Sequence, residues 1–482
     1  MSITRKFIFF GAFFLAIFWS ACKDDFDNYS ANPNDRLSFS VDTLRFDTIL
    51  STINTSVNAF MVYNRNKKPL LISSIRLRNA DAGGYKINVD GRAGASFQDV
   101  EIRVNDSLYV FVDIKPKENG INQLLLITDY IDFTTNGVQQ SVVLEAHTQD
   151  VTIWKGLTIF SDTILTGEKP CLIYDSLVIA ESASVKVEAG ATWFMHAKAE
   201  IIVKGRLQLL GTLEKPVTIR GDRMDRLVGV SYDLIPGQWG GIRIDSTSFN
   251  NVFEHARIRN AYYGLDLRPS EPDESKLFLK NVVLTNCKGT LVNSVNCRFT
   301  AENCEFSNAR GALLDLMGGD YEFTHCTLAN YYGSPAELGW GSTNNETVIL
   351  STTEDYPSEE AIFRNTIIWG SKANGSSGIR INPHETGAIT FRFDHCLLPD
   401  EGEDDNDFIQ CIWNKNPKFV DIDYVKNNQY EFFYDFRLDS ISPARNAADP
   451  VYSIKLPYDL NGVDRFADGE PDLGAYEWRI EN

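Results

Sequence analysis

Five short apolar runs of this chain each carry one polar residue shortly after a glycine. Because side chains alternate along a strand, the apolar neighbours would face a core and the polar residue between them would face outward. The polar residues of the five runs are Arg243, Asp266, Asn293, Asp315 and Arg380. If the runs stack in register, these side chains form one external column.

Such a column could act on sugars in two ways. Asp266 and Asp315 would lie two strands apart, about 9.6 Å between backbones, which is near the upper limit for the two carboxylates of an inverting glycosidase. Arg243 and Arg380 could bind the carboxylates of acidic sugars through paired hydrogen bonds. These four residues are the catalytic candidates. The plainer alternative is that exposed strand positions are polar in any solenoid.

Two pairs of tyrosines precede glycines at equivalent bends. They are Tyr262 with Tyr263 and Tyr331 with Tyr332. Aromatic rings fixed on a rigid surface stack on sugar rings, but cross-coil packing explains such rings equally well. These four tyrosines, together with Asn293, are the candidate glycan-binding residues.

The run from Asp400 to Asp407 is rich in carboxylates. Clustered carboxylates suit calcium, although this run has no regular ligand spacing and a solvated loop is the plainer interpretation. No paired Cys-x-x-Cys motif occurs, so no zinc site is expected. We expect no metal and no cofactor, with calcium as the one alternative left open.

A repeat must position all of these residues. Six segments open with His or Asn, continue with a small or thiol side chain, and carry an apolar residue at the fourth place. They begin at residues 255, 281, 303, 325, 365 and 395, so the steps are 26, 22, 22, 40 and 30 residues. The 40-residue step is long enough for an insertion or for one unrecognised turn.

A short, fixed period means that each unit buries its apolar face only by stacking on its neighbours. A period near 22 with alternating apolar residues and Gly-punctuated bends predicts one coil of a parallel β-helix. Four segments place Asn at the sixth position, namely Asn260, Asn286, Asn308 and Asn330. Because Asn tolerates left-handed dihedrals and its amide can bond to the next coil, these four residues predict an internal ladder that sets the register.

Length and charge limit the other classes. A chain of 482 residues is too long for one ordinary core, so two domains or a solenoid are expected. The net charge of −19 argues against a nucleic-acid partner, because phosphate binding needs concentrated Lys and Arg.

The first 22 residues read as a secretory signal. Arg5 and Lys6 precede an apolar run from Phe7 to Trp19, which is too short to span a bilayer, and the run leads to Cys22. The ending Trp-Ser-Ala-Cys resembles the lipobox of bacterial lipoproteins. In that family the signal peptide is cleaved before the cysteine, and the cysteine is then lipidated. The following Lys-Asp-Asp is similar to the surface-export signal of Bacteroidota lipoproteins. The resemblance implies an outer-membrane lipoprotein anchored through Cys22 and exposed at the cell surface.

The remaining chain divides by pattern. Residues 23–36 form a polar tether, and residues 37–150 alternate in short runs that predict a β-sandwich. Phrases such as Phe46-Asp47-Thr48 and Thr135-Asn136-Gly137 resemble an immunoglobulin-like domain of Bacteroidota lipoproteins. Residues 151–440 are assigned to the β-helix, since 177–221 resemble the entry coils of bacterial β-helix proteins of the pectin-lyase-like class. Residues 441–482 resemble their closing segment, which a solenoid needs to cover exposed edges.

The expected fold is therefore all-β, a β-sandwich followed by a capped right-handed parallel β-helix. The expected function is glycan binding or adhesion by the long face of the solenoid. One alternative is a polysaccharide lyase or glycoside hydrolase, and another is a structural partner in a surface complex. The sequence does not decide whether the protein is an enzyme, although it favours a binding protein. The partners expected are the membrane, through the anchor, and a polysaccharide or surface protein.

Overall fold

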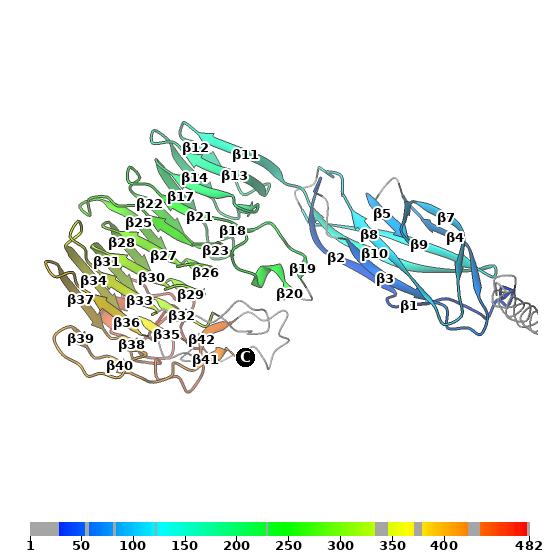
Figure 1. Cartoon of the computed structure of the whole chain (residues 1–482). Helices are drawn as coiled ribbons and strands as arrows, with labels where there is room; N and C mark the ends of the chain where they lie inside the picture. Colours follow the sequence, from blue (N-terminus) through cyan, green and yellow to red (C-terminus); the bar gives the residue numbers. More distant parts are fainter. Residues whose placement is uncertain are drawn as a thin grey trace, which may run out of the picture. The chain divides into compact units, whose positions relative to one another are not determined.

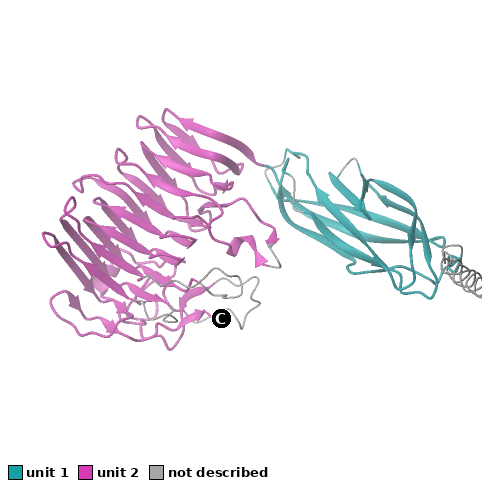
Figure 2. Ribbon diagram, in the orientation of Figure 1, with its two compact units in different colours: residues 1–150 teal, residues 151–482 magenta. Residues whose placement is uncertain are grey.

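The computed structural model describes residues 28–53, 57–80, 83–120, 123–227, 230–332, 346–370, 378–422 and 434–479. The predicted signal and Cys22 lie outside these ranges. The chain forms two compact units, residues 1–150 and 151–482 (Figure 2). Within the described ranges, no helix is long and apolar enough to cross a bilayer.

The first unit is a β-sandwich. Its strands alternate between buried and exposed residues, as in β8 (Ser107–Ile114), where Val110 and Val112 are buried and Tyr109 and Phe111 are exposed. One sheet has the order β1 (Ser38–Phe39), β3 (Asn58–Tyr63), β8, β5 (Tyr85–Val89) and β6 (Arg92–Gly94). The other has the order β2 (Thr43–Leu50), β10 (Val138–Gln149), β9 (Leu125–Thr135), β4 (Leu70–Leu77) and β7 (Ser96–Ile102).

The second unit is a solenoid of parallel strands in three stacks (Figure 1). Stack 1 contains β16 (Glu200–Val203), β21 (Gly241–Ile244), β24 (Leu265–Leu267), β27 (Val292–Val295), β30 (Leu314–Met317), β33 (Val348–Ser351) and β36 (Ile379–Asn382). Stack 2 contains β15 (Thr192–Met195), β18 (Val217–Gly221), β23 (Ala256–Arg259), β26 (Val283–Cys287), β29 (Glu305–Ala309), β32 (Thr327–Asn330), β35 (Ile367–Gly370), β38 (Leu397–Leu398) and β40 (Ile412–Trp413). Two long strands, β11 (Thr152–Ile159) and β13 (Cys171–Ile179), begin both stacks.

Stack 3 is a separate sheet of ten parallel strands. It contains β12 (Thr163–Leu165), β14 (Ser184–Glu188), β17 (Arg206–Leu210), β22 (Asn251–Glu254), β25 (Ser275–Lys280), β28 (Arg298–Glu302), β31 (Gly319–Thr324), β34 (Ser358–Arg364), β37 (Ala388–Asp394) and β39 (Phe408–Ile409). Each coil passes through stacks 3, 2 and 1 in turn. The predicted β-sandwich followed by a solenoid of parallel strands is thus what the chain forms.

The register of stack 2 follows the six-segment repeat of the sequence. Ile258 pairs with Leu284, Leu284 with Phe306, and Phe306 with Leu328, so the fourth positions of the segments lie above one another. Leu328 pairs directly with Ile368. The 40-residue step therefore contains an insertion within one coil and skips no coil of this stack.

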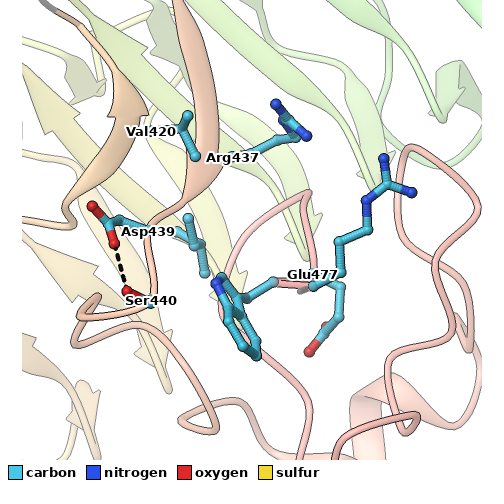
Figure 3. A pocket seen from close by; sticks show the side chains of 8 residues that line it. Val420, Arg437, Asp439, Ser440 and Glu477 are labelled. Atoms are coloured by element: carbon cyan, nitrogen blue, oxygen red, sulfur yellow. Dashed lines mark hydrogen bonds between the residues drawn. The ribbon is translucent and has the colours of Figure 1, made fainter. Parts of the chain in front are cut away.

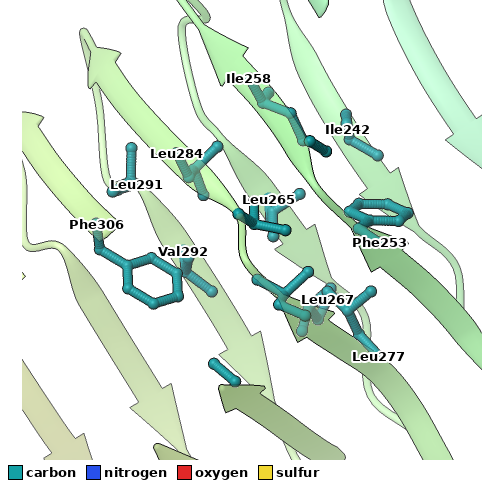
Figure 4. Packing of buried hydrophobic residues seen from close by; sticks show 14 of the residues in the cluster. Ile242, Phe253, Ile258, Leu265, Leu267, Leu277, Leu284, Leu291, Val292 and Phe306 are labelled. Atoms are coloured by element: carbon teal, nitrogen blue, oxygen red, sulfur yellow. The ribbon is translucent and has the colours of Figure 1, made fainter. Parts of the chain in front are cut away.

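The core lies between the three stacks. Inward side chains from all three interlock, as Ile242, Phe253 and Ile258 do in Figure 4. Cys304, Cys326 and Cys396 share the second repeat position and are buried free thiols, as expected for small apolar side chains in a stack.

Register is held by a row at the first position of each segment. These six residues all adopt left-handed dihedrals, with φ between +46° and +58°, and they are His255, Asn281, Asn303, His325, Asn365 and His395. The Asn281 amide bonds to the His255 ring at 3.0 Å and accepts a bond from Asn303 at 2.7 Å. The Asn365 amide bonds to the His325 ring at 3.0 Å. We call these six residues the bend row.

The predicted ladder at the sixth position has a different chemistry. Asn260, Asn286 and Asn308 do adopt left-handed dihedrals. Their amides, however, do not bond to one another among the described contacts. Asn308 accepts a bond from the Tyr331 backbone, and Asn330 accepts one from the Ala309 backbone. The amide ladder of this solenoid is therefore the bend row, because there the side chains of neighbouring coils are close enough to pair.

Two strands of stack 2, β32 and β35, are buried on both sides. All four residues of β32 and of β35 are buried, because the C-terminal segment covers their outer side. This segment, residues 414–479, is called the C-terminal cover. It contains β41 (Phe419–Asp421), β42 (Asp435–Leu438) and the short helix α2 (Pro450–Ser453). The solenoid strands end at Trp413, so the cover begins before residue 441, the predicted boundary.

The cover is held by apolar packing and by one buried cation. Phe436, Leu438 and Leu473 pack against the outer side of stack 2, and each such side chain contributes about 1.5–3 kcal/mol on burial. Arg465 is fully buried. It donates to Glu477 at 3.2 Å and to the Asn303 amide oxygen at 2.6 Å, which ties the cover to the bend row.

Candidate functional site

The polar side chains predicted to align do form a column on stack 1. Arg243 of β21 is the register partner of Asp266 of β24. Asp266 is in turn the partner of Asn293, and Asn293 is the partner of Asp315. We call these four residues the polar row. They come from four successive coils, so Asp266 and Asp315 are two coils apart as predicted.

Asp266 is the centre of a charge network within the polar row. Its carboxylate lies 3.4 Å from Arg243 and 3.0 Å from Arg268, and it accepts a hydrogen bond of 3.1 Å from the Asn293 amide. Arg243 also lies 3.8 Å from Glu200 in the preceding coil. With only 9% of its surface exposed, Asp266 is more buried than an outward strand position predicts.

The far end of the row differs from the prediction. β33 places Ile349 between Asp315 and Arg380, so the arginine is two coils from the carboxylate rather than one. Arg380 pairs instead with Glu346. Sequence reasoning missed β33 because the insertion in this coil separates it from the repeat segment. Burial raises the pKa of Asp315, and the charge of Arg380 opposes that shift.

The first tyrosine pair borders the polar row. Tyr262 is 56% exposed at the bend before β24, so its ring is available to a ligand. Tyr263 is half-buried, and burial together with the nearby Glu200 raises its pKa to about 12. Tyr262 is therefore the aromatic residue of this pair that a sugar could reach.

The second tyrosine pair is not available as predicted. Tyr332 is buried. Tyr331 packs its ring against Phe419, Tyr434 and Phe436 of the C-terminal cover, with centroids 5.8–6.3 Å apart. Tyr331 is a packing residue because the cover occupies the side of stack 2 that the sequence left open.

The acidic run from Asp400 to Asp407 is a self-bonded loop. Asp404 accepts hydrogen bonds from the Cys411 backbone and the Trp413 indole, each 3.1 Å long. Asp405 accepts from the backbone of Asp407 at 2.8 Å. Over the described ranges, no group of three or more His, Cys, Asp or Glu side chains is arranged to hold a metal ion. The carboxylates of Asp404 and Asp405 thus accept hydrogen bonds from the loop itself and from the residues that follow it.

Sequence reasoning missed a histidine–aspartate pair. His196 follows β15 and Asp222 follows β18, one coil later, and the His196 Nδ1 lies 2.6 Å from the Asp222 carboxylate. The ring of Tyr174, one coil earlier, packs against the His196 ring in a tilted arrangement with centroids 4.3 Å apart. Burial raises the pKa of Tyr174. The two residues are 26 positions apart in sequence, and the repeat is hard to recognise in these early coils.

The pair has the geometry of a general base. A carboxylate that accepts from Nδ1–H fixes the imidazole tautomer and leaves Nε2 as the acceptor. The His196 side chain is 43% exposed, so a substrate proton could reach the ring. Asp266 of the polar row is no comparable base, since two guanidinium groups and an amide already occupy its carboxylate.

Comparisons with known proteins add little. No family model matches the chain, and no curated protein matches it. Among solved structures, it is similar over 25% of its length to 26% of a family 123 glycoside hydrolase from Clostridium perfringens, with 12% identity and a TM-score of 0.17. It is also similar, over 26% of its length and 89% of the other chain, to a PapD-like domain of human CEP192, with 8% identity and a TM-score of 0.17. A third similarity covers 23% of this chain and 30% of the Pseudomonas fluorescens alkylpurine DNA glycosylase AlkC bound to DNA, with 10% identity and a TM-score of 0.16. Scores this low carry no conclusion about fold or function.

Proposed function

We propose that this protein binds glycans through stack 1, as a lipid-anchored protein exposed at the cell surface. The observation that carries the proposal is the polar row with its exposed neighbour Tyr262. An aromatic ring beside fixed hydrogen-bonding groups matches a sugar, whose ring has an apolar face and a polar rim. The proposal of a lipid anchor is based on the lipobox-like sequence that leads to Cys22.

The row favours binding over hydrolysis. Inverting glycosidases keep open space between their two carboxylates for a water molecule and the sugar. Here Asn293 stands between Asp266 and Asp315 and bonds to the first of them. The pairing of Asp266 with Arg243 and Arg268 also keeps its oxygens from a substrate proton.

A second candidate function rests on a different observation, the His196–Asp222 pair. An oriented imidazole could abstract a proton from a sugar acid or activate water, as a polysaccharide lyase or a glycoside hydrolase requires. This activity would not use the polar row. His196→Gln would then abolish turnover while leaving binding by stack 1 unchanged.

The test is a glycan array probed with the full chain in mild detergent, with product assays run in parallel. We expect retention of one glycan class without reducing ends or unsaturated products. Arg268→Gln removes an exposed guanidinium beside the row and should weaken binding about tenfold, as loss of a charged hydrogen bond does. The control is Arg392→Gln, which changes an exposed arginine on stack 3.

Other outcomes decide between the alternatives. Product formation that His196→Gln abolishes would make the protein an enzyme. If no glycan on the array is bound and crosslinking at the cell surface recovers a partner protein, the result would support the structural-partner alternative. Loss of membrane attachment and of lipid labelling in Cys22→Ser tests the anchor separately.

A further inference from the structure

The C-terminal cover contains a pocket that belongs to neither of the sites above. Its volume is about 320 Å³, at the lower end of the range for small-molecule sites. Figure 3 shows Arg437 and Asp439 on different sides of it. Trp478 and Arg479, near the end of the described chain, complete the wall.

The tryptophan in the wall is rigidly held. The Trp478 backbone N–H donates to Asp472 at 2.7 Å. The guanidinium of Arg445 lies 3.6 Å from the centroid of its indole, a cation–π contact that fixes the ring. A fixed indole in a pocket wall is a platform for the apolar face of a sugar.

Arg437 and Arg479 line the pocket and Arg445 lies behind its tryptophan, and the three differ in what they already bind. Arg437 is engaged by Asp435, with hydrogen bonds of 3.0 and 2.6 Å. Arg445 lies 3.8 Å from Asp468. Arg479, in contrast, is exposed and forms no ion pair within the described part of the chain. A ligand that carries an anion would supply the missing partner.

The remaining polar groups of the pocket can hydrogen-bond to the hydroxyl groups of a ligand. Asp439 is fixed by a 2.9 Å hydrogen bond from Ser440, and that bond lowers the pKa of its carboxyl. An ionised carboxylate accepts hydrogen bonds and cannot pair with a second anion, so it selects a ligand with hydroxyl groups. The apolar part of the wall is Val420 and Leu438.

We propose that this pocket binds a carboxylate-bearing sugar residue, with the carboxylate on Arg479, the ring on Trp478 and a hydroxyl on Asp439. The site is on the cover and the polar row is on stack 1, so this proposal does not depend on glycan binding by the row. It commits to an acidic sugar because a free anion would leave Trp478 and Asp439 without a role, and a neutral sugar would leave Arg479 without one.

The experiment is calorimetric titration of the full chain in detergent with short galacturonate and glucuronate oligomers. Their neutral galactose and glucose counterparts and acetate are titrated in the same buffer. We expect an acidic oligomer to bind at least tenfold more tightly than its neutral counterpart or acetate, and Arg479→Gln to weaken it tenfold or more. Arg479→Lys should retain part of the affinity, because it keeps the charge but loses the bidentate geometry.

The control is Arg392→Gln on stack 3, outside both sites, which should leave the affinity unchanged. Equal binding of acidic and neutral oligomers, equal binding of acetate, no binding of either uronate, or full affinity in Arg479→Gln would each overturn the proposal.

Discussion

Glu359 is an acid inside the apolar interior of the solenoid, and its replacement by Gln gives a quantitative prediction. The side chain points inward from β34 and is 3% exposed, and neither carboxylate oxygen has a hydrogen-bond partner in the described part of the chain. Burial raises its pKa from 4.5 to about 9, and the nearby charge of Asp315 adds to the shift. At neutral pH the folded protein therefore keeps a proton that the unfolded chain releases.

The direction and the size of the change in unfolding free energy follow from that difference in proton binding. A raised pKa gives stability that is complete below the unfolded value and is lost as the pH rises to the folded value. Each pH unit between about 4.5 and 9 thus costs about 1.4 kcal/mol. At pH 7 the loss is about 3 kcal/mol. Glu359→Gln keeps the shape of the protonated acid but cannot ionise, so it should match the wild type near pH 4.5 and exceed its stability by about 3 kcal/mol at pH 7.

The assay is denaturant unfolding followed by tryptophan fluorescence on the chain from residue 23. Residues 23–150 contain no tryptophan, so the signal reports on the 151–482 unit alone. The control is Glu360→Gln, the exposed neighbour on the same strand, which should show no pH-dependent gain. A stability difference between Glu359→Gln and the wild type that is the same at pH 5 and pH 7 would refute the reasoning.

Three further predictions concern the solenoid and its cover. Arg465→Met removes the guanidinium that donates to Glu477, the Asn303 amide and the Gly474 carbonyl, so these buried acceptors lose their donor and the cover should be destabilised by about 3–5 kcal/mol; hydrogen exchange across residues 442–478 should accelerate while the sandwich does not change. Phe363→Ala removes a fully buried ring whose centroid lies 4.8 Å from those of Phe323 and Phe393 in the adjacent coils, so the denaturant midpoint of the 151–482 unit should fall by the equivalent of about 3–5 kcal/mol; a loss under about 1 kcal/mol would mean that the stack collapses around the gap. Asn281→Ala should cost about 1–2 kcal/mol more than Asn281→Gly in thermal unfolding, because both lose the amide bonds but only Ala must bear φ of +57°; equal costs would argue that the dihedral stores no strain.

The repeat made the solenoid predictable. One six-residue pattern fixed the register of stack 2 over six coils, because identical positions of a parallel solenoid must lie above one another. The alternation around Asp266 and Asn293 placed them on one column for the same reason. Periodicity is a local property of the chain, so it can be read without knowing any long-range contact.

Long-range contacts account for the features that the sequence did not predict. The unbroken apolar run of β35 reads as a strand buried on both sides, but the sequence does not say that the C-terminal cover provides the second side. That cover removed Tyr331 from the surface. The position of Ile349 in the column was hidden by the insertion, and the meeting of His196 with Asp222 requires the register of coils whose repeat is weak.

The assignment of the amide ladder failed for a subtler reason. Asn260 and Asn281 both sit at bends with left-handed dihedrals, so conformational preference alone cannot tell one Asn column from another. What distinguishes them is whether the neighbouring coil presents a side chain or a backbone group to the amide. Only the arrangement of the coils decides that.

The central claim is that stack 1 binds sugar beside its polar row, and the most direct test compares two exposed tyrosines. Tyr262 is 56% exposed next to the row, and Tyr109 is 51% exposed on the sandwich. The measurement is the dissociation constant of the best glycan from the array for the wild type, Tyr262→Ala and Tyr109→Ala. We predict a loss of about tenfold or more for Tyr262→Ala, as expected for a ring that stacks on sugar, and no change for Tyr109→Ala. Equal affinity in all three proteins, or a loss confined to Tyr109→Ala, would contradict the account.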